Sequence, residues 1–207
     1  NLLGTIYKGG VIVPIIQTLL LTVLAMSIER WLTIRKASGK RNLTQFVTDI
    51  KVALEKNDVA GAKELCTKQG GSVGNVVFSA LEKYADVEKI EDMSKDQKMV
   101  AIQKTIEEAT ALELPTLEQN LAVVATITTL GTLMGLLGTV IGMIRSFAAL
   151  ANAGSPDSVA LSTGISEALI NTAFGIATGA LAVVSYNYFT ARIDKITYVI
   201  DEAGFTI

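Results

Sequence analysis

The chain has few of the residues that build catalytic and metal centres. Its 207 residues include no histidine, one cysteine and three prolines. Without histidine, a metal site would need carboxylates alone, and no close carboxylate cluster falls in the apolar segments. The lone Cys66 cannot form a disulfide within the chain. Serine and threonine nucleophiles would have no histidine base, so we expect no enzyme activity, no metal and no cofactor.

The chain also lacks a basic surface for nucleic acid. It carries 18 Lys and Arg against 20 Asp and Glu, for a formal net charge of −2. Basic residues interleaved with aromatic ones are typical of nucleic-acid-binding proteins, and no such cluster occurs here. We therefore expect no nucleic-acid partner.

Charge is missing altogether from three long apolar runs, at 9–28, 119–144 and 168–191. Each run reaches or exceeds the roughly 20 residues that a helix needs to cross the hydrocarbon of a bilayer. Half of the residues are hydrophobic, whereas a soluble domain seldom needs three such runs. The sequence therefore predicts an all-α integral membrane protein with three transmembrane helices surrounded by membrane lipids.

The basic residues around the first run predict its orientation. Only Lys8 precedes the run, whereas Arg30, Arg35 and Lys36 follow it closely. A secretory signal has the opposite order, with its positive charge first. Because basic residues favour the cytoplasmic side, we expect a periplasmic N-terminus and a cytoplasmic C-terminus.

Periodicity and helix-stop signals predict how the elements follow one another. The expected elements are an N-terminal interfacial helix over 1–9, transmembrane helix 1 over 10–31, a small cytoplasmic helical domain over 32–94, a long helix containing transmembrane helix 2 over 95–150, a periplasmic link over 151–164, transmembrane helix 3 over 165–191 and a cytoplasmic C-terminal helix over 192–207. Two of the membrane helices thus extend into the cytoplasm. We expect Asn42 to cap a helix, Gly70 and Gly71 to end one, and Pro115 to kink the long helix.

Four acidic residues lie in the early part of the expected long helix: Glu107, Glu108, Glu113 and Glu118. Solvated helix surface is the favoured interpretation, and a docking face for a partner is the alternative.

Small and hydroxylated residues form a stripe on each of the last two membrane helices. The stripe on the second helix contains Thr128, Thr132, Gly135, Thr139, Gly142 and Ser146, and the stripe on the third contains Ala168, Thr172, Gly175, Gly179 and Ala182. Spacings of three, four and seven place such residues on one helix face. Gly131 and Gly135, like Gly138 and Gly142, also form small-xxx-small pairs that favour close helix packing. We interpret the glycines as packing residues and Thr139 and Thr172 as lining a polar pathway.

A depth estimate supports this interpretation of the threonines. Thr139 lies six residues before Arg145 on an outward helix, and Thr172 lies five after Glu167 on an inward one. At a rise of 1.5 Å per residue, these separations are about 9 Å and about 7.5 Å. The two hydroxyls should therefore share one depth, with Glu167 one or two turns nearer the outside.

Glu167 itself has two equally weighted interpretations. An ionisable group at membrane depth is a functional candidate, whereas an ion pair with Arg145 would be a structural role. Apart from Glu167, no Asp, His or Lys lies in the three apolar spans. A proton-moving chain would therefore need a carrier on another polypeptide.

At these positions the sequence resembles the ExbB/TolQ/MotA proton-channel family, and its ExbB/TolQ branch most closely. The matching stretches are "GLLGTVIGMIRSF" at 135–147, "ISEALINTAFGIATGALAVVSYNYF" at 165–189, and "GGVIVPII" with "SIERW" around the first membrane helix. Three expected spans fit ExbB and TolQ, whereas a flagellar MotA would show four. Thr132 stands where many relatives have proline, and with Thr128 it extends the hydroxyl stripe inward.

The resemblance to this family also implies an oligomeric state and a partner, which the spacing of residues alone does not. It implies a ring-forming homopentamer that encloses the single membrane helices of an ExbD or TolR partner dimer, with a proton-carrying aspartate on the partner. Carried over to this chain, the pore threonines of the family are Thr139 and Thr172, and its outer glutamate is Glu167.

The resemblance also implies a function. We expect a proton-channel subunit in the bacterial cytoplasmic membrane that couples the proton motive force, through a TonB-like protein, to outer-membrane transport. A TolQ-type subunit of the Tol-Pal envelope system is the alternative, and a passive membrane scaffold is a more distant one. The sequence does not separate proton from sodium as the ion.

Overall fold

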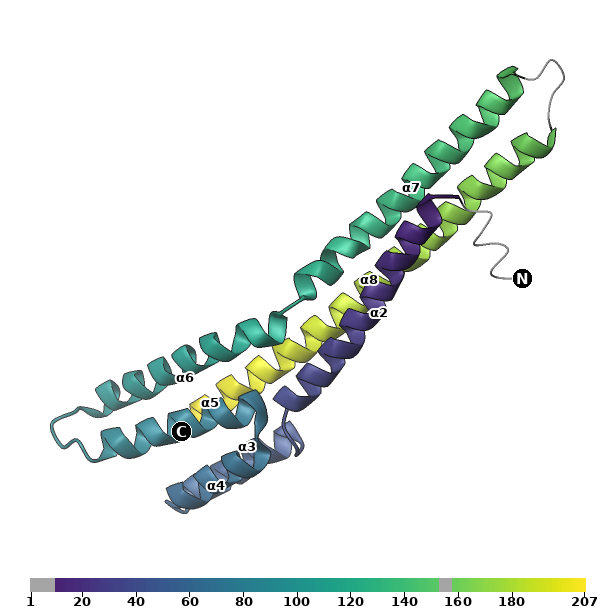
Figure 1. Ribbon diagram of the computed structural model, residues 1–207. Coiled ribbons are helices and arrows are strands. Elements are labelled where there is room, and N and C mark those ends of the chain that lie inside the picture. Colours follow the sequence, from purple (N-terminus) through teal and green to yellow (C-terminus); the bar gives the residue numbers. More distant parts are fainter. Residues whose placement is uncertain (1–9, 153–157) are drawn as a thin grey trace. The chain divides into compact units, whose positions relative to one another are not determined.

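A computed structural model describes residues 10–152 and 158–207, and these residues form helices joined by short turns (Figure 1). The helices are α2 (Ile12–Ala37), α3 (Leu43–Glu55), α4 (Val59–Gln69), α5 (Gly71–Glu88), α6 (Lys95–Glu118), α7 (Leu121–Asn152) and α8 (Ser158–Thr206). Three stretches are long and apolar enough to cross a membrane: α2, the α7 part of Lys95–Ala151, and α8. The protein is an all-α, multi-pass membrane protein. The interfacial helix expected over 1–9 and residues 153–157 of the expected link lie outside the described residues.

The chain divides into two compact units. The membrane unit contains the chain up to Ile28 together with Asn120–Tyr188, and the extramembrane unit contains Glu29–Gln119 and Phe189–Ile207. Two helices are longer than their expected counterparts. Helix α2 continues to Ala37, six residues beyond the expected end, and α8 begins at Ser158 and includes both the expected third span and the C-terminal helix.

In the membrane unit, α7 and α8 run side by side, and the first part of α2 packs along them (Figure 1). Val23, Val124, Ile127 and Ala182 form a buried cluster shared by the three helices. Large apolar side chains on the outer faces remain exposed, among them Leu133, Leu136, Ile144, Leu169, Ile176 and Val184. A contiguous apolar exterior of this kind is suited to lipid or to neighbouring helices rather than water.

The extramembrane unit is held by caps and by a buried core. Asn42 caps α3, as predicted, because its side chain accepts a hydrogen bond from the Thr44 N–H. Gly70 ends α4, as predicted, whereas Gly71 is already the first residue of α5. Gln69 has no exposed surface. Its Nε2 donates to the carbonyls of Ser38 (2.7 Å) and Arg41 (3.1 Å), so it fastens the turn after α2 to the end of α4.

The expected uninterrupted helix over 95–150 is divided in the structure. Helix α6 continues through Pro115 and ends at Glu118, and α7 begins at Leu121. Between them, Asn120 has a φ of +65°, a left-handed conformation that asparagine tolerates better than most residues. The last carbonyls of a helix lack intrahelical donors. Here the buried Arg30 supplies one, because its Nη1 donates to the carbonyls of Thr116 (3.0 Å) and Leu117 (3.3 Å).

Glu113 has a defined role within the extramembrane unit. Its Oε2 accepts a hydrogen bond from Ser72 (2.7 Å), and its Oε1 accepts one from Asn75 (3.1 Å), both on α5. This glutamate therefore joins α6 to α5 and is not simply part of a solvated helix face.

Cys66 is expected to resist thiol reagents in the folded protein. Burial raises the pKa of this thiol to about 12 from an ordinary value of 9.0. Because the thiolate is the reactive species, alkylation near neutral pH should be about a thousandfold slower than for an exposed cysteine. Mass spectrometry after timed iodoacetamide treatment, with and without denaturant, measures this ratio. Rapid labelling of the folded protein would contradict the burial.

The raised pKa also gives a stability trend with a definite sign. The unfolded chain releases the Cys66 proton above about pH 9, whereas the folded chain holds it up to about pH 12. The contribution of Cys66 to stability is therefore complete below pH 9 and is lost as the pH rises toward 12. A Cys66→Ala variant should show a smaller loss of stability over this range in denaturant titrations.

Candidate functional site

The crossing of α7 and α8 is built from glycine. A Cβ added at Gly175 would lie 2.6 Å from the Cα of Gly135 and 2.7 Å from the carbonyl oxygen of Gly131. The other predicted packing glycines also face the opposite helix: Gly138 meets Asn171, Gly142 meets Gly164 and Ala168, and Gly179 meets Thr132. Backbones can approach this closely only where side chains are absent.

Close approach of the backbones brings Thr139 and Thr172 together. Their Oγ1 atoms are in hydrogen-bond contact across the two helices, and either can donate. Thr139 Oγ1 also lies 3.3 Å from the carbonyl of Ala168, and Thr172 Oγ1 lies 3.4 Å from that of Gly135. Both threonines are half-buried. The hydroxyls thus share one depth, as the spacing to Arg145 and Glu167 predicts, and form a polar point in otherwise apolar segments.

Thr139 Oγ1 also contacts the Gly135 carbonyl of its own helix over 3.3 Å, and Thr128 and Thr132 make the same kind of local hydrogen bond. Thr128 Oγ1 donates to the Val124 carbonyl and Thr132 Oγ1 to the Thr128 carbonyl, each at 3.3 Å within α7. A hydroxyl bonded to its own helix satisfies its donor locally. Their side chains nevertheless belong to the same stripe, since Thr132 Oγ1 lies beside Gly179.

Glu167 is paired and covered. Arg145 Nη1 donates to Glu167 Oε1 over 2.7 Å. Glu167 is only 8% exposed, whereas the Arg145 side chain is 51% exposed. Gly10, with a φ of +67°, lies directly over the carboxylate: a Cβ there would overlap it and come within 3.3 Å of Arg145 Nη1. The turn that precedes α2 therefore closes one side of the ion pair.

The glutamate and the threonine pair occupy different sides of α8. Five residues separate Glu167 from Thr172, and five steps around an α-helix rotate the side chain by about 140°. Glu167 accordingly contacts Gly10 and Arg145, whereas Thr172 contacts Thr139 and Gly135. The sequence argument gave Glu167 a depth, one or two turns nearer the outside than Thr172, and did not assign it to a helix face.

Sequence reasoning missed one buried polar residue of this region, Asn171, whereas Ser146 belongs to the stripe expected on the second membrane helix. Asn171 and Ser146 have no exposed surface. Ser146 Oγ contacts the carbonyls of Gly142 (3.1 Å) and Leu161 (3.3 Å). Asn171 follows Glu167 by four residues, and this spacing, in a run without charge, was the available signal.

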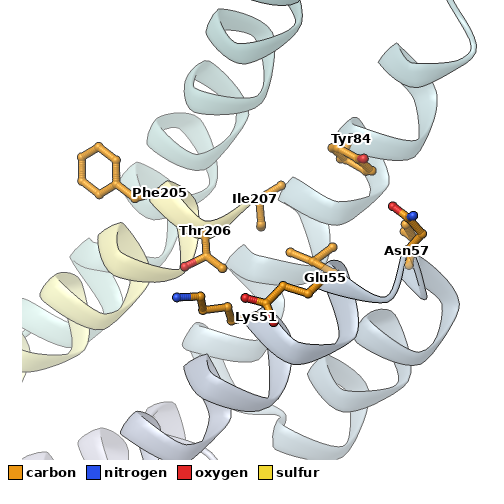
Figure 2. Close-up of a pocket in the computed structure, with 9 residues that line it drawn as sticks. Lys51, Glu55, Asn57, Tyr84, Phe205, Thr206 and Ile207 are labelled. Atoms are coloured by element: carbon orange, nitrogen blue, oxygen red, sulfur yellow. The ribbon is translucent and has the colours of Figure 1, made fainter.

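A separate concave region lies in the extramembrane unit. Figure 2 shows Lys51 and Glu55 of α3 facing Thr206 and Ile207 at the end of α8, with the Phe205 ring pointing away. The cavity measures about 460 Å³. Lys51 and Glu55 are exposed to solvent there. In the described part of the chain, no three His, Cys, Asp or Glu residues are grouped so that they could hold a metal ion.

Comparison with known proteins agrees with the geometry of the membrane unit. Residues 73–202, which include α7 and most of α8, match the MotA/TolQ/ExbB proton channel family. The Tol-Pal system protein TolQ of Pseudomonas aeruginosa is 26% identical over 190 residues, covering 88% of this chain and 81% of its own length. The biopolymer transport protein ExbB of Pseudomonas putida is 28% identical over 193 residues, covering 90% of this chain.

An ExbB homolog of Methanothermobacter thermautotrophicus is 27% identical over 199 residues, or 94% of this chain. The chain spans 66% of that relative and 56% of the Pseudomonas putida protein. The family match covers more than half of the chain, including the helix pair that carries the hydroxyls and the ion pair. The chain belongs to the MotA/TolQ/ExbB proton channel family.

Proposed function

We propose that the chain is the channel-forming subunit of an energy-transducing complex in the bacterial cytoplasmic membrane, rather than an enzyme. The observation that carries the proposal is the hydroxyl contact between Thr139 and Thr172, made where α7 and α8 cross on glycine. Two hydroxyls at one depth can orient water or hydrogen-bond a carboxyl group. Neither can carry charge, so the proton carrier is a carboxylate on a partner.

In this proposal the partner is a dimer of ExbD-like or TolR-like single-span chains, held inside a homopentamer of this chain. The Thr139 and Thr172 side chains face the partner, and the glycines keep α7 and α8 close enough to present them together. Arg145 and Glu167 lie nearer the periplasmic side, with the N-terminus periplasmic and the C-terminus cytoplasmic. Exposed apolar residues of α7 and α8 supply the area for neighbouring subunits and lipid.

The coupled process is TonB-dependent outer-membrane transport, with a TonB-like protein as the further partner. A Tol-Pal role is the second candidate, because the TolQ relative aligns over 88% of the chain and over more of its own length than either ExbB relative. Deleting the chain separates the two: loss of energised uptake supports the first role, and envelope leakage with uptake intact supports the second.

Thr172→Val is expected to reduce proton flux about tenfold while the complex still assembles. Valine has nearly the shape of threonine but lacks the hydroxyl that contacts Thr139, and a lost hydrogen bond at the transition state costs about this factor. The measurement is proton flux into liposomes that hold the chain and its genetically neighbouring single-span partner, under an imposed pH gradient.

Thr163→Val is the matched control. Thr163 is exposed on the same helix, and its hydroxyl donates to the Val159 carbonyl within α8. Its flux should stay at the wild-type level. A passive scaffold would tolerate both changes equally, so wild-type flux in Thr172→Val would contradict the channel role. Equal flux from the chain without its partner would contradict the separate carrier.

A further inference from the structure

Asn171 is a fully buried amide without a protein partner. It has no exposed surface in the membrane unit, and neither its Oδ1 nor its Nδ2 makes a hydrogen bond within the described part of the chain. Buried polar side-chain atoms nearly always have a hydrogen-bond partner, and an unpaired one in an apolar region is costly. Leucine has a similar branched shape and would avoid this cost. Packing alone therefore does not account for asparagine here.

The space around Asn171 is made by a glycine on the opposite helix. A Cβ at Gly138 would overlap the Asn171 Cβ and lie 2.6 Å from its Cγ and 2.8 Å from its Nδ2. The amide group is thus seated over the bare backbone of α7. This contact fixes the side chain in the interface between α7 and α8, away from lipid.

Asn171 also lies one turn from Glu167 on nearly the same face of α8. Four residues correspond to about 6 Å along the helix and about 40° around it. Side chains at this spacing can hydrogen-bond to each other. Glu167 at present contacts Arg145 of α7 and the backbone of Gly10, in the turn before α2. Asn171 is the next polar side chain inward on that side.

We propose that Asn171 is a positioning residue that gives the Glu167 carboxyl group a second hydrogen-bonding position, about one turn deeper in the membrane than Arg145. As a carboxylate, Glu167 pairs with the Arg145 guanidinium. As a neutral acid, its O–H donates to Asn171 Oδ1 while Asn171 Nδ2 donates to its carbonyl oxygen. The role of these two positions of Glu167 in proton transfer rests on the proposed function.

The proton balance of this step is simple. The carboxylate takes one proton from hydronium in the solvent at the outer side, which leaves water, and it releases Arg145. When the carboxyl group returns to Arg145, its O–H bond breaks and an O–H bond forms on the carboxylate that the proposed partner carries. No other covalent bond changes.

The test compares Asn171→Leu with wild type in the purified complex with its partner. Infrared difference spectra between acidic and neutral pH report the C=O stretch of the protonated Glu167, identified by its loss in Glu167→Gln. We expect this band to shift in Asn171→Leu, because the acid loses both amide hydrogen bonds. Proton flux should fall about tenfold, while the thermal midpoint of the complex stays equal or rises.

Thr178→Val is the control for burial. Thr178 is also fully buried on α8, and its hydroxyl donates to the Phe174 carbonyl of its own helix. Neither the Glu167 band nor the flux should change in this variant. If Asn171→Leu does not assemble, Asn171→Ala gives the same readout with a smaller side chain.

An unmoved Glu167 band in an assembled Asn171 variant would overturn the inference, whatever happens to flux. A shifted band together with no flux from wild-type complex would support the two positions of Glu167 and contradict the proposed function instead. The infrared measurement therefore tests the role of Asn171, and the flux of the wild-type complex tests the proposed function, so that either one can be contradicted without the other.

Discussion

Replacing Gly175 with leucine is expected to separate α7 from α8 and to prevent assembly of a folded membrane unit. Even the first added carbon would lie 2.6 Å from the Cα of Gly135, 2.7 Å from the Gly131 carbonyl oxygen and 2.9 Å from the Gly135 nitrogen. These are backbone atoms, so no rotamer change can relieve the overlap. Overpacking usually costs about 1–3 kcal/mol, and a clash between two backbones should exceed that range.

Thermal unfolding of the detergent-solubilised chain measures this effect, and Ala177→Leu provides its control. Ala177 is exposed in the next half-turn of the same helix, so the added carbon atoms meet no backbone. We expect Ala177→Leu to unfold at the wild-type temperature and Gly175→Leu to yield little folded protein. Similar behaviour of the two variants would mean that the crossing is looser than the distances indicate.

The positions of the membrane helices follow from the sequence because one physical requirement dominates them. Crossing a bilayer demands about 20 residues without charge, and three runs of the chain satisfy this length. The shared depth of Thr139 and Thr172 is also accessible from sequence, although their contact is not. Both lie at fixed distances from charged residues at the outer ends of their helices, and small residues surround both.

Contacts between distant parts of the chain are not accessible in this way. Arg30 caps carbonyls 86 and 87 residues away, and no local pattern indicates where α6 stops. Pro115 lies within α6, which continues through it and ends three residues later at Glu118. Tertiary hydrogen bonding to the helix end, together with the left-handed Asn120, determines the interruption.

The cover over Glu167 illustrates the same limit within the membrane unit. Gly10 lies in a turn, and the carboxylate occupies the space that a side chain there would fill, which no local pattern in the sequence indicates. The depth of a residue along a membrane helix follows from its separation in sequence from a charged residue. The residues that each face of the helix contacts depend on how the three helices pack. The sequence therefore gives the relative depth of Glu167 and Thr172 but not the contacts of Glu167 with Gly10 and Arg145.

Removing the cation from this buried pair gives the second large effect. Arg145→Leu leaves the Glu167 carboxylate, 8% exposed, beneath Gly10 without its 2.7 Å partner. Breaking a fully buried pair costs about 3–5 kcal/mol. Because half of the Arg145 side chain is exposed, solvent screening reduces this figure, and we expect about 2 kcal/mol.

A double-mutant cycle with Glu167→Gln separates the charge from the packing of the two side chains. Glutamine keeps the size of glutamate but removes the buried charge, so Arg145→Leu should cost much less in that background. Denaturant titration of the four proteins gives the coupling energy. Equal costs in both backgrounds would mean that Arg145 stabilises the unit through its aliphatic stem, and that Glu167 is held by Gly10 and by α8 rather than by its cation. A large coupling would instead make Arg145 the group that holds the carboxyl group at the outer end of α8, which is the state from which any proton uptake by Glu167 must begin.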